Sequence, residues 1–152
     1  MIMTFPEKIP IERMEDYQTE YMGRMADGRL FWVYTTFLYT IPYKEIVKRG
    51  EDWKAYRREY CILFLFDKNG DLMSSQFQSE PLSRASYLDA YLKEWVAALR
   101  PIEYMDIEVK LFQVMIDGHV FGLVPNEEGK CIELQPSNTI AFYEPWDGAY
   151  HT

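Results

Sequence analysis

Cysteine and histidine are scarce in this chain, which has only two of each among its 152 residues. Cys61 and Cys131 are too few for a framework of several disulfides, and each lies in an apolar run where a small buried side chain is expected. No CxxC or HxxxH spacing brings zinc ligands together, so we expect no metal site. A catalytic pair of Cys61 and His119 on adjacent strands is conceivable, but burial in the run YCILFLF would raise the thiol's pKa and make it inert.

Glycine is also scarce, and none of the eight glycines lies in a phosphate-binding pattern. The sequence contains no GxGxxG, GxxxxGK or GxSxG motif, which excludes the common nucleotide-binding loops and the nucleophile turn of α/β-hydrolases. The segment Asp67–Asp71 resembles the start of a calcium loop, but its glycine comes too early and Gln78 stands where the template needs a glutamate. We interpret this segment as a hairpin turn, expect no cofactor, and favour a protein that is not an enzyme.

Basic residues are outnumbered, because 16 Lys and Arg stand against 24 Asp and Glu, which gives a net charge of −8. Such a chain is poorly suited to nucleic acid or to an anionic membrane surface, since both require Lys and Arg. No apolar run approaches the ~20 residues of a membrane span, and the start MIMTFPEKIPIERMEDY lacks the basic and apolar regions of a signal peptide. We therefore expect a cytoplasmic protein that binds neither nucleic acid nor membranes, and whose acidity suits a basic protein partner.

Aromatic residues are abundant: they make up 16% of the sequence and favour pleated, half-buried sheets. Two Asp-Gly pairs, Asp27-Gly28 and Asp117-Gly118, stand between strand-like runs and predict tight hairpins. The run 60–66 lacks polar alternation, which predicts a central strand buried on both faces. The predicted strands lie at 17–25, 30–40, 60–66, 72–78, 105–116, 119–124, 131–134 and 139–143.

One long helix is predicted at about residues 83–99, because apolar residues recur there at the spacing of a single helical stripe. The stripe consists of Leu88, Tyr91, Leu92, Trp95, Val96 and Leu99. Asp89 and Lys93 form an i,i+4 pair in the favourable order, and a short helix over Tyr43–Arg49 would end at Gly50. The fold class that follows is α+β, a mainly antiparallel sheet of about seven or eight strands, open or partly closed, packed on one long helix.

The chain is expected to form a single domain over residues 1–152, with an irregular N-terminal arm at 1–16 and a C-terminal tail at 144–152. The tail is the most suggestive binding segment, because it combines large rings with acids in a loop shaped by glycine and proline. Trp32 and Tyr34, which share one face of the strand 30–40, are also candidate binding residues. The alternative for all of these aromatic residues is a structural role. The candidate binding residues are Trp32, Tyr34, Glu144, Trp146, Asp147 and Tyr150.

Four segments spread along the chain carry most of its turns and aromatic motifs. They are IPIERMEDYQTEYMGRMADGRLF, LFLFDKNGDL, LFQVMIDGHVFGLV and the end EPWDGAYHT. Taken together they resemble a family of small bacterial proteins of unknown function. The resemblance spans nearly the whole chain and implies a single domain, but it implies no particular activity, cofactor or catalytic residue, since turns and aromatic residues specify a fold rather than a reaction.

The leading functional hypothesis is a non-enzymatic protein-binding module of the bacterial cytosol, such as an acidic inhibitor, an immunity-type protein or a regulatory protein. It depends on the net charge, the lack of a catalytic constellation and the acidic, aromatic tail. The alternative is a small-ligand binder or an enzyme with an aromatic pocket between helix and sheet, lined by side chains such as Trp32, Tyr91 and Trp95. A third hypothesis is a structural subunit of an oligomer.

Overall fold

A computed structural model of the protein describes residues 4–137 and 140–152. In this part of the chain, twelve β-strands form three antiparallel sheets, accompanied by two short α-helices. The smallest sheet pairs β1 (Lys8–Ile11) with β7 (Ile107–Lys110). The other two sheets have five strands each.

The first five-stranded sheet, here called the central sheet, has the strand order β5-β4-β3-β2-β6. Its strands are β2 (Tyr21–Met25), β3 (Leu30–Tyr39), β4 (Arg57–Phe66), β5 (Leu72–Pro81) and β6 (Ile102–Tyr104). The second, here called the C-terminal sheet, has the order β12-β11-β10-β9-β8. Its strands are β8 (Phe112–Ile116), β9 (His119–Asn126), β10 (Cys131–Gln135), β11 (Ala141–Phe142) and β12 (Tyr150–His151).

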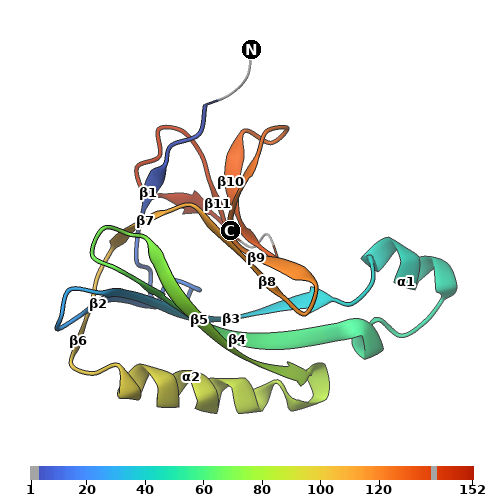
Figure 1. The fold of residues 1–152 in the computed structure, drawn as a ribbon. Coiled ribbons are helices and arrows are strands. Elements are labelled where there is room, and N and C mark those ends of the chain that lie inside the picture. The colour runs from blue at the N-terminus through green and yellow to red at the C-terminus, as the bar shows by residue number, and fades with distance from the viewer. Residues whose placement is uncertain (1–3, 138–139) are drawn as a thin grey trace.

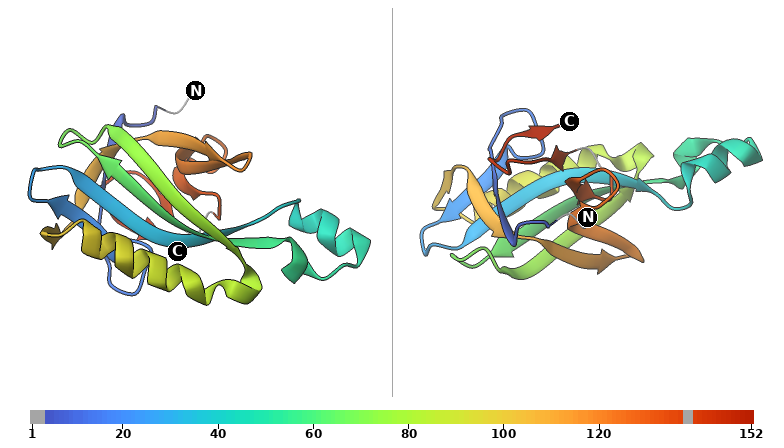
Figure 2. Two further views of the ribbon diagram at one scale, coloured as in Figure 1. Left: turned by 60° about the horizontal axis from the view of Figure 1, so that its bottom comes forward. Right: turned by 90° about the horizontal axis from the view of Figure 1, so that it is seen from above.

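The central sheet forms the middle layer of the molecule (Figure 1 and Figure 2). Helix α2 (Ser86–Ala98) covers one of its faces, and the other two sheets lie over the opposite face. A hydrophobic core fills the space on each side of the central sheet. The core between the central sheet and the other two sheets is here called the main core, and the smaller core lies between the central sheet and α2. The strands β3 and β4 therefore bury both of their faces.

β3 and β4 pair over their full ten-residue length, and their side chains alternate between the two cores. The face toward the other sheets carries Trp32, Tyr34, Tyr60, Ile62, Phe64 and Phe66. The face toward α2 carries Phe31, Val33, Cys61 and Leu63. Because both faces are apolar, β4 has no polar alternation in its sequence, and the prediction of a central strand at 60–66 is confirmed.

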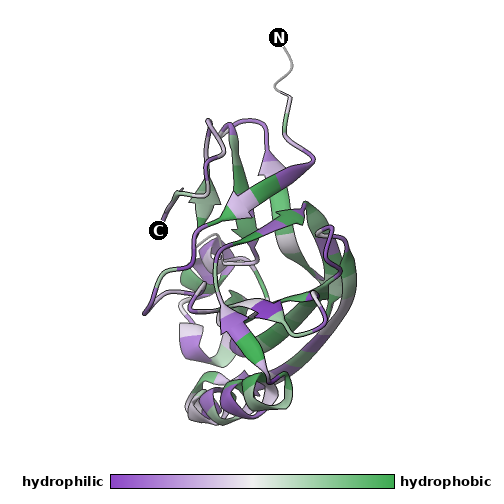
Figure 3. Cartoon of the chain, turned by 90° about the vertical axis from the view of Figure 1, so that its left-hand side faces the viewer, coloured by the Kyte–Doolittle hydropathy of each residue, from purple (hydrophilic) through white to green (hydrophobic). Residues whose placement is uncertain are grey.

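α2 packs on the central sheet through one stripe of its surface, and Figure 3 views this helix end-on below the sheet. Its buried residues are Leu88, Leu92 and Val96. The other members of the predicted stripe, Tyr91, Trp95 and Leu99, are partly buried at the margin of the same core. The predicted ion pair of Asp89 with Lys93 is confirmed, with 2.9 Å between the charged groups.

The predicted fold class, one α+β unit with a single sheet on one long helix at 83–99, is wrong. The described residues are mostly β and divide their strands among three sheets, and both α-helices are short. α2 begins only at Ser86, because Leu82–Arg84 forms a 3-10 turn. The strand predicted at 105–116 is divided at Leu111, because β7 pairs with β1 whereas β8 pairs with β9. Local patterns locate strands but do not identify their partners, so the number of sheets could not be predicted.

The predicted N-terminal arm is not irregular throughout, because β1 pairs with β7 and buries Ile9 and Ile11 completely in the main core. The predicted tail contains β12, which pairs with β11. The strand predicted at 139–143 begins outside the described residues, and within them β11 covers only two positions.

Helix α1 (Tyr43–Arg49) ends at Gly50, as the sequence predicts. It projects beyond the sheets at the far ends of β3 and β4, away from the body of the molecule (Figure 1). Its C-terminal Arg49 contacts Glu45 at 3.5 Å within the helix. Among the described residues, no helix combines the length and apolar character that crossing a membrane requires.

Candidate functional site

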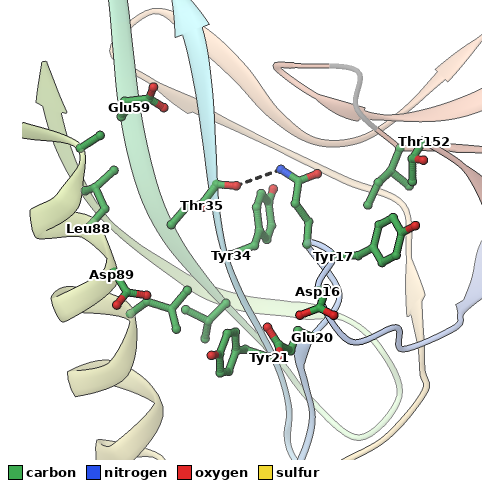
Figure 4. Close-up of a pocket in the computed structure, with 15 residues that line it drawn as sticks. Asp16, Tyr17, Glu20, Tyr21, Tyr34, Thr35, Glu59, Leu88, Asp89 and Thr152 are labelled. Atoms are coloured by element: carbon green, nitrogen blue, oxygen red, sulfur yellow. Dashed lines mark hydrogen bonds between the residues drawn. The ribbon is translucent and has the colours of Figure 1, made fainter. Parts of the chain in front are cut away.

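A pocket of about 640 Å³ opens at the edge of the central sheet (Figure 4). β2 pairs with β3 only as far as Tyr21 opposite Val33, so from Tyr34 onward β3 has β4 as its only strand neighbour among the described residues. Residues 16–20, here called the pocket loop, pass this free edge and form one side of the pocket. α2 contributes the opposite side, and residues 33–35 of β3 lie between them.

Hydrogen bonds hold the pocket loop against the sheet. Gln18 Nε2 donates to the backbone carbonyl of Thr35 at 2.9 Å, where a further strand would otherwise bond to β3. The indole N–H of Trp32 donates to the backbone carbonyl of Gln18 at 2.8 Å. The fully buried Thr19 has its hydroxyl 2.5 Å from the hydroxyl of Tyr150. The wall of the pocket is thus fixed from two sheets.

The pocket is acidic, because four carboxylates line it and no Lys or Arg is among its lining residues. They belong to Asp16, Glu20, Glu59 and Asp89. Glu59 is paired with Arg57 at 2.7 Å and Asp89 with Lys93 at 2.9 Å. Asp16 and Glu20, both on the pocket loop, form no ion pair with a described residue. The cation of Arg13 is close by, but its Nε donates to the backbone carbonyl of Glu20 at 2.7 Å and not to its carboxylate.

Three tyrosines share the pocket with these carboxylates: Tyr17, Tyr21 and Tyr34. Tyr34 is only 2% exposed, and its hydroxyl has no hydrogen-bond partner in the described part of the chain. Burial raises the pKa of Tyr34 far above its ordinary value, so the phenol stays protonated and can donate or accept a hydrogen bond. A buried hydroxyl left unbonded costs about 1–3 kcal/mol. Because the oxygen is itself covered, a ligand group recovers this cost only by displacing the side chains that cover it.

The pocket's neighbourhood offers no activated thiol. Cys61 is fully buried, and this burial, with a smaller effect of the Asp89 charge, raises the pKa of its thiol to about 12. His119 begins β9 in a different sheet, so the conceivable Cys61–His119 pair on adjacent strands does not form. The described residues contain no cluster of three or more side chains able to hold a metal ion. The arrangement is suited to binding a cation.

The structure places only one of the six predicted binding residues, Tyr34, in the pocket. Trp32 and Tyr150 are bonded to the pocket loop and hold it in place without lining the pocket. A pocket between helix and sheet was the alternative prediction, but Tyr91 and Trp95 of α2 do not line it.

The remaining predicted residues lie elsewhere, in the tail. Trp146 is half-buried and packs against the main core, with its ring centroid 6.0 Å from that of Phe5. Glu144 and Asp147 are exposed, and the carboxylate of Asp147 accepts the N–H of Ala149 at 3.2 Å. Trp146 therefore contributes to packing on the core, and the tail acids stand apart from the pocket.

The sequence interpretation missed the pocket loop and the carboxylates on it. The segment Glu15–Tyr21, EDYQTEY, interleaves acids with tyrosines, and this composition was a usable signal. It was assigned to a strand beginning at Tyr17, whereas β2 begins at Tyr21. Asp16 has a positive φ of 67°, which turns the chain out of an extended path before it reaches β2.

Comparison with known proteins gives no relative: no protein-family model, no curated protein and no solved structure matches this chain. The resemblance to small bacterial proteins of unknown function therefore stays a prediction, and function must be inferred from the pocket itself.

Proposed function

We propose that this protein is a non-enzymatic binding module that accepts a positively charged side chain of a basic partner protein in its pocket. The observation that carries the proposal is the buried hydroxyl of Tyr34, which lacks a partner in the described residues and lines the same pocket as the unpaired Asp16 and Glu20. An acidic cluster alone would suit solvent, whereas a buried unbonded hydroxyl beside it calls for a polar group from outside.

An arginine side chain fits this chemistry better than a lysine. Its guanidinium carries five N–H donors in a planar fork that matches carboxylates, and it is more weakly hydrated than an ammonium. The carboxylates of Asp16 and Glu20 would accept its outer N–H groups. The phenol oxygen of Tyr34 would accept another once the side chains that cover it move aside. The rings of Tyr17 and Tyr21 add aromatic faces on which a guanidinium can stack.

The charge of the whole molecule supports the same proposal. A net charge of −8 attracts a basic partner over long distances and speeds encounter, which is how acidic inhibitors and immunity-type proteins engage basic targets. The proposal includes a location in the bacterial cytosol, supported by two buried cysteine thiols that are not joined in a disulfide.

A second candidate function is the binding of a small organic cation such as a polyamine. It is favoured by the size of the pocket, since about 640 Å³ falls within the range of roughly 300–1,000 Å³ typical of small-ligand sites. Both candidates require the same carboxylates and the same hydroxyl, and they differ in whether the cation is attached to a protein.

The test is calorimetric titration with an oligo-arginine peptide, an oligo-lysine peptide and free spermidine, at low and high salt. We expect the arginine peptide to bind most tightly, with an affinity that falls as salt shortens the Debye length from about 10 Å at 0.1 M to about 3 Å at 1 M. Glu20→Gln and Tyr34→Phe should each weaken binding about tenfold, because each removes a hydrogen bond to a charged group.

The matched control is Asp147→Asn, which removes the same charge from an exposed site outside the pocket. It should leave the affinity within about twofold of the native value, since a distant exposed charge is screened. Equal losses for Glu20→Gln and Asp147→Asn would show that only net charge matters and would refute the pocket proposal. Spermidine binding as tightly as the arginine peptide would favour the small-cation candidate.

A further inference from the structure

The outer edge of β5 is open, and it is uncharged over Leu72–Ser79. β5 is the terminal strand of the central sheet, is ten residues long and pairs only with β4 among the described residues. Residues 73–78 are all exposed. Edge strands are usually protected by charged residues, by proline or by short length. β5 carries such residues only at its C-terminal end, Glu80 and Pro81, and Leu72–Ser79 contains neither a charge nor a proline. This edge therefore retains the capacity to pair with another strand.

The register identifies the backbone groups that are free. The N–H of Thr40 donates to the carbonyl of Tyr56 at 2.8 Å, and this pair continues the register of β3 with β4. Even-numbered residues of β4 therefore direct their N–H and C=O groups toward β3, and odd-numbered residues direct theirs toward β5.

The partners of those odd-numbered residues on β5 include Gln76 and Gln78, so their backbone groups bond to β4. Because backbone groups alternate sides along a strand, those of Ser75, Phe77 and Ser79 point outward from the sheet edge. Three successive outward positions thus offer both a donor and an acceptor.

The sequence of β5 reads the same in both directions around Phe77, as Ser75-Gln76-Phe77-Gln78-Ser79. We propose that the β5 edge binds the β5 edge of a second copy of this chain, antiparallel and on a two-fold axis at Phe77, to form a homodimer. In this register Phe77 faces Phe77, Ser75 faces Ser79 and Gln76 faces Gln78. The first two kinds of pair use the outward groups, which gives about six backbone hydrogen bonds across the axis.

Both faces of β5 have room for the second copy. Phe77 is 40% exposed, and its ring centroid lies 6.2 Å from that of Tyr60 on the face toward the C-terminal sheet. Pairing on the axis brings two Phe77 rings together, and cross-strand aromatic pairs of this kind stabilise sheets. On the opposite face Gln76 and Gln78 are exposed, so α2 leaves that side of the strand uncovered.

Charge and area determine how strong such a dimer is. The net charge of −8 repels two copies at long range, but the uncharged Leu72–Ser79 segment brings no like charges into contact. The contact is essentially one strand wide, so it buries less than the roughly 1,200 Å² of a standard interface. The expected dimer is weak, with a dissociation constant of about 10 µM to 1 mM.

The experiment is sedimentation equilibrium of the full chain from about 5 µM to about 1 mM, across the expected range of dissociation constants. Two double variants test the register: Gln76→Lys with Gln78→Lys, and Gln76→Glu with Gln78→Glu. Each homodimer would oppose like charges at both glutamine pairs, which should weaken dimerisation about tenfold or more. Mixing the two variants places Lys opposite Glu, and it should restore a heterodimer.

The control places Gln113→Lys with Met115→Lys on β8, the edge strand of the C-terminal sheet, where both side chains are exposed. This double variant should dimerise like the native chain. The proposal is overturned by a native chain that stays monomeric to about 1 mM, or by a dimer that the β8 variant weakens as much as the β5 variants do. Failure of the mixture to recover dimerisation also overturns it. None of these variants touches the pocket, so the outcome is independent of the proposed function.

Discussion

The hydroxyl of Tyr150 lies 2.5 Å from the hydroxyl of Thr19, although 131 positions of the chain separate them. Tyr150 belongs to β12 of the C-terminal sheet, and Thr19 lies in the pocket loop. The same Thr19 hydroxyl accepts the backbone N–H of Met14 at 2.9 Å. The last strand of the described chain thus stabilises a loop near its beginning, and with it one wall of the pocket.

Tyr150→Phe is expected to lower the free energy of unfolding by about 1 kcal/mol, because it breaks this hydrogen bond and leaves the fully buried Thr19 hydroxyl with one partner fewer. Urea denaturation of the variant and the native chain measures the change. A native-like midpoint and slope would contradict the role given to Tyr150.

Tyr34→Phe is expected to have the opposite effect on stability. The Tyr34 hydroxyl is buried without a partner in the described residues, so removing it relieves a desolvation cost and should raise the free energy of unfolding by about 1 kcal/mol. The same variant should bind cations less well. Tyr150→Phe is its matched control, since both changes delete one phenolic hydroxyl. A destabilised Tyr34→Phe protein would show that the hydroxyl is bonded within the chain.

Lys93→Ala should strengthen the binding of a cation in the pocket. Lys93 lies 2.9 Å from Asp89, and both side chains are well exposed, so the pair contributes little to stability. Its removal leaves Asp89 uncompensated and makes the pocket more acidic. Titration with the oligo-arginine peptide should show an affinity gain of about twofold to fivefold at low salt. Unchanged affinity would mean that Asp89 does not contribute to the site.

Alkaline pH should destabilise the protein between about pH 9 and pH 12. Burial raises the pKa of Tyr34 above its ordinary value of 10.0, and it raises the pKa of Cys61 from 9.0 to about 12. In this window the unfolded chain releases these protons while the native chain keeps them. The contribution of these groups to the free energy of unfolding is therefore fully present below the window, and it is lost as pH rises through the window.

Urea denaturation at a series of pH values measures this slope, which amounts to at most about 1.4 kcal/mol per pH unit for each such group. Tyr34→Phe should show a shallower decline than the native chain, because one of the buried acids is gone. An identical pH dependence for the two proteins would contradict the burial of the Tyr34 phenol.

Gly23→Ala should destabilise the pairing of β2 with β6. A Cβ atom at Gly23 would lie 1.9 Å from the backbone oxygen of Glu103 on the neighbouring strand, and two backbones cannot separate there without breaking the ladder. We expect a loss of roughly 1–3 kcal/mol in the free energy of unfolding. Gly129→Ala is the control, since its Cβ would meet only side-chain atoms, at 3.2 Å, which can move. Equal effects of the two substitutions would refute the steric explanation.

The sequence predicted well the elements whose patterns are local. β4 was located because a strand buried on both faces is apolar throughout, and α1 was located because Gly50 supplies the left-handed conformation at its end. What could not be predicted was pairing between distant segments. The sequence of β1 alone predicts an irregular arm, and only its pairing with β7 makes it a strand. The local sequence of a strand does not show which distant strand it pairs with.

The position and lining of the pocket escaped prediction for a similar reason. It exists because β2 starts at Tyr21, opposite Val33, whereas β3 continues beyond Val33 to Tyr39. The offset between two paired strands is a property of their register. The two-residue period of a β-strand shows that Tyr34 shares a face with Trp32. It does not show which of the two rings has a polar atom that is hydrogen-bonded. The structure makes that distinction: Trp32 donates to Gln18, whereas the Tyr34 hydroxyl has no partner among the described residues.

The two cores on either side of β3 and β4 have a consequence for how these strands find their alignment. In a sheet with one solvent-exposed face, shifting a strand by one residue exposes its apolar side chains to water. The cost of that exposure disfavours the shifted register. Here the same shift would leave nearly every side chain in apolar surroundings. It would, however, move Trp32 toward α2, into space shaped for the smaller Val33, and it would leave a void in the main core where Trp32 now lies. The alignment of the two innermost strands is therefore selected by volume, so the protein distinguishes its native pairing from its neighbours by steric fit.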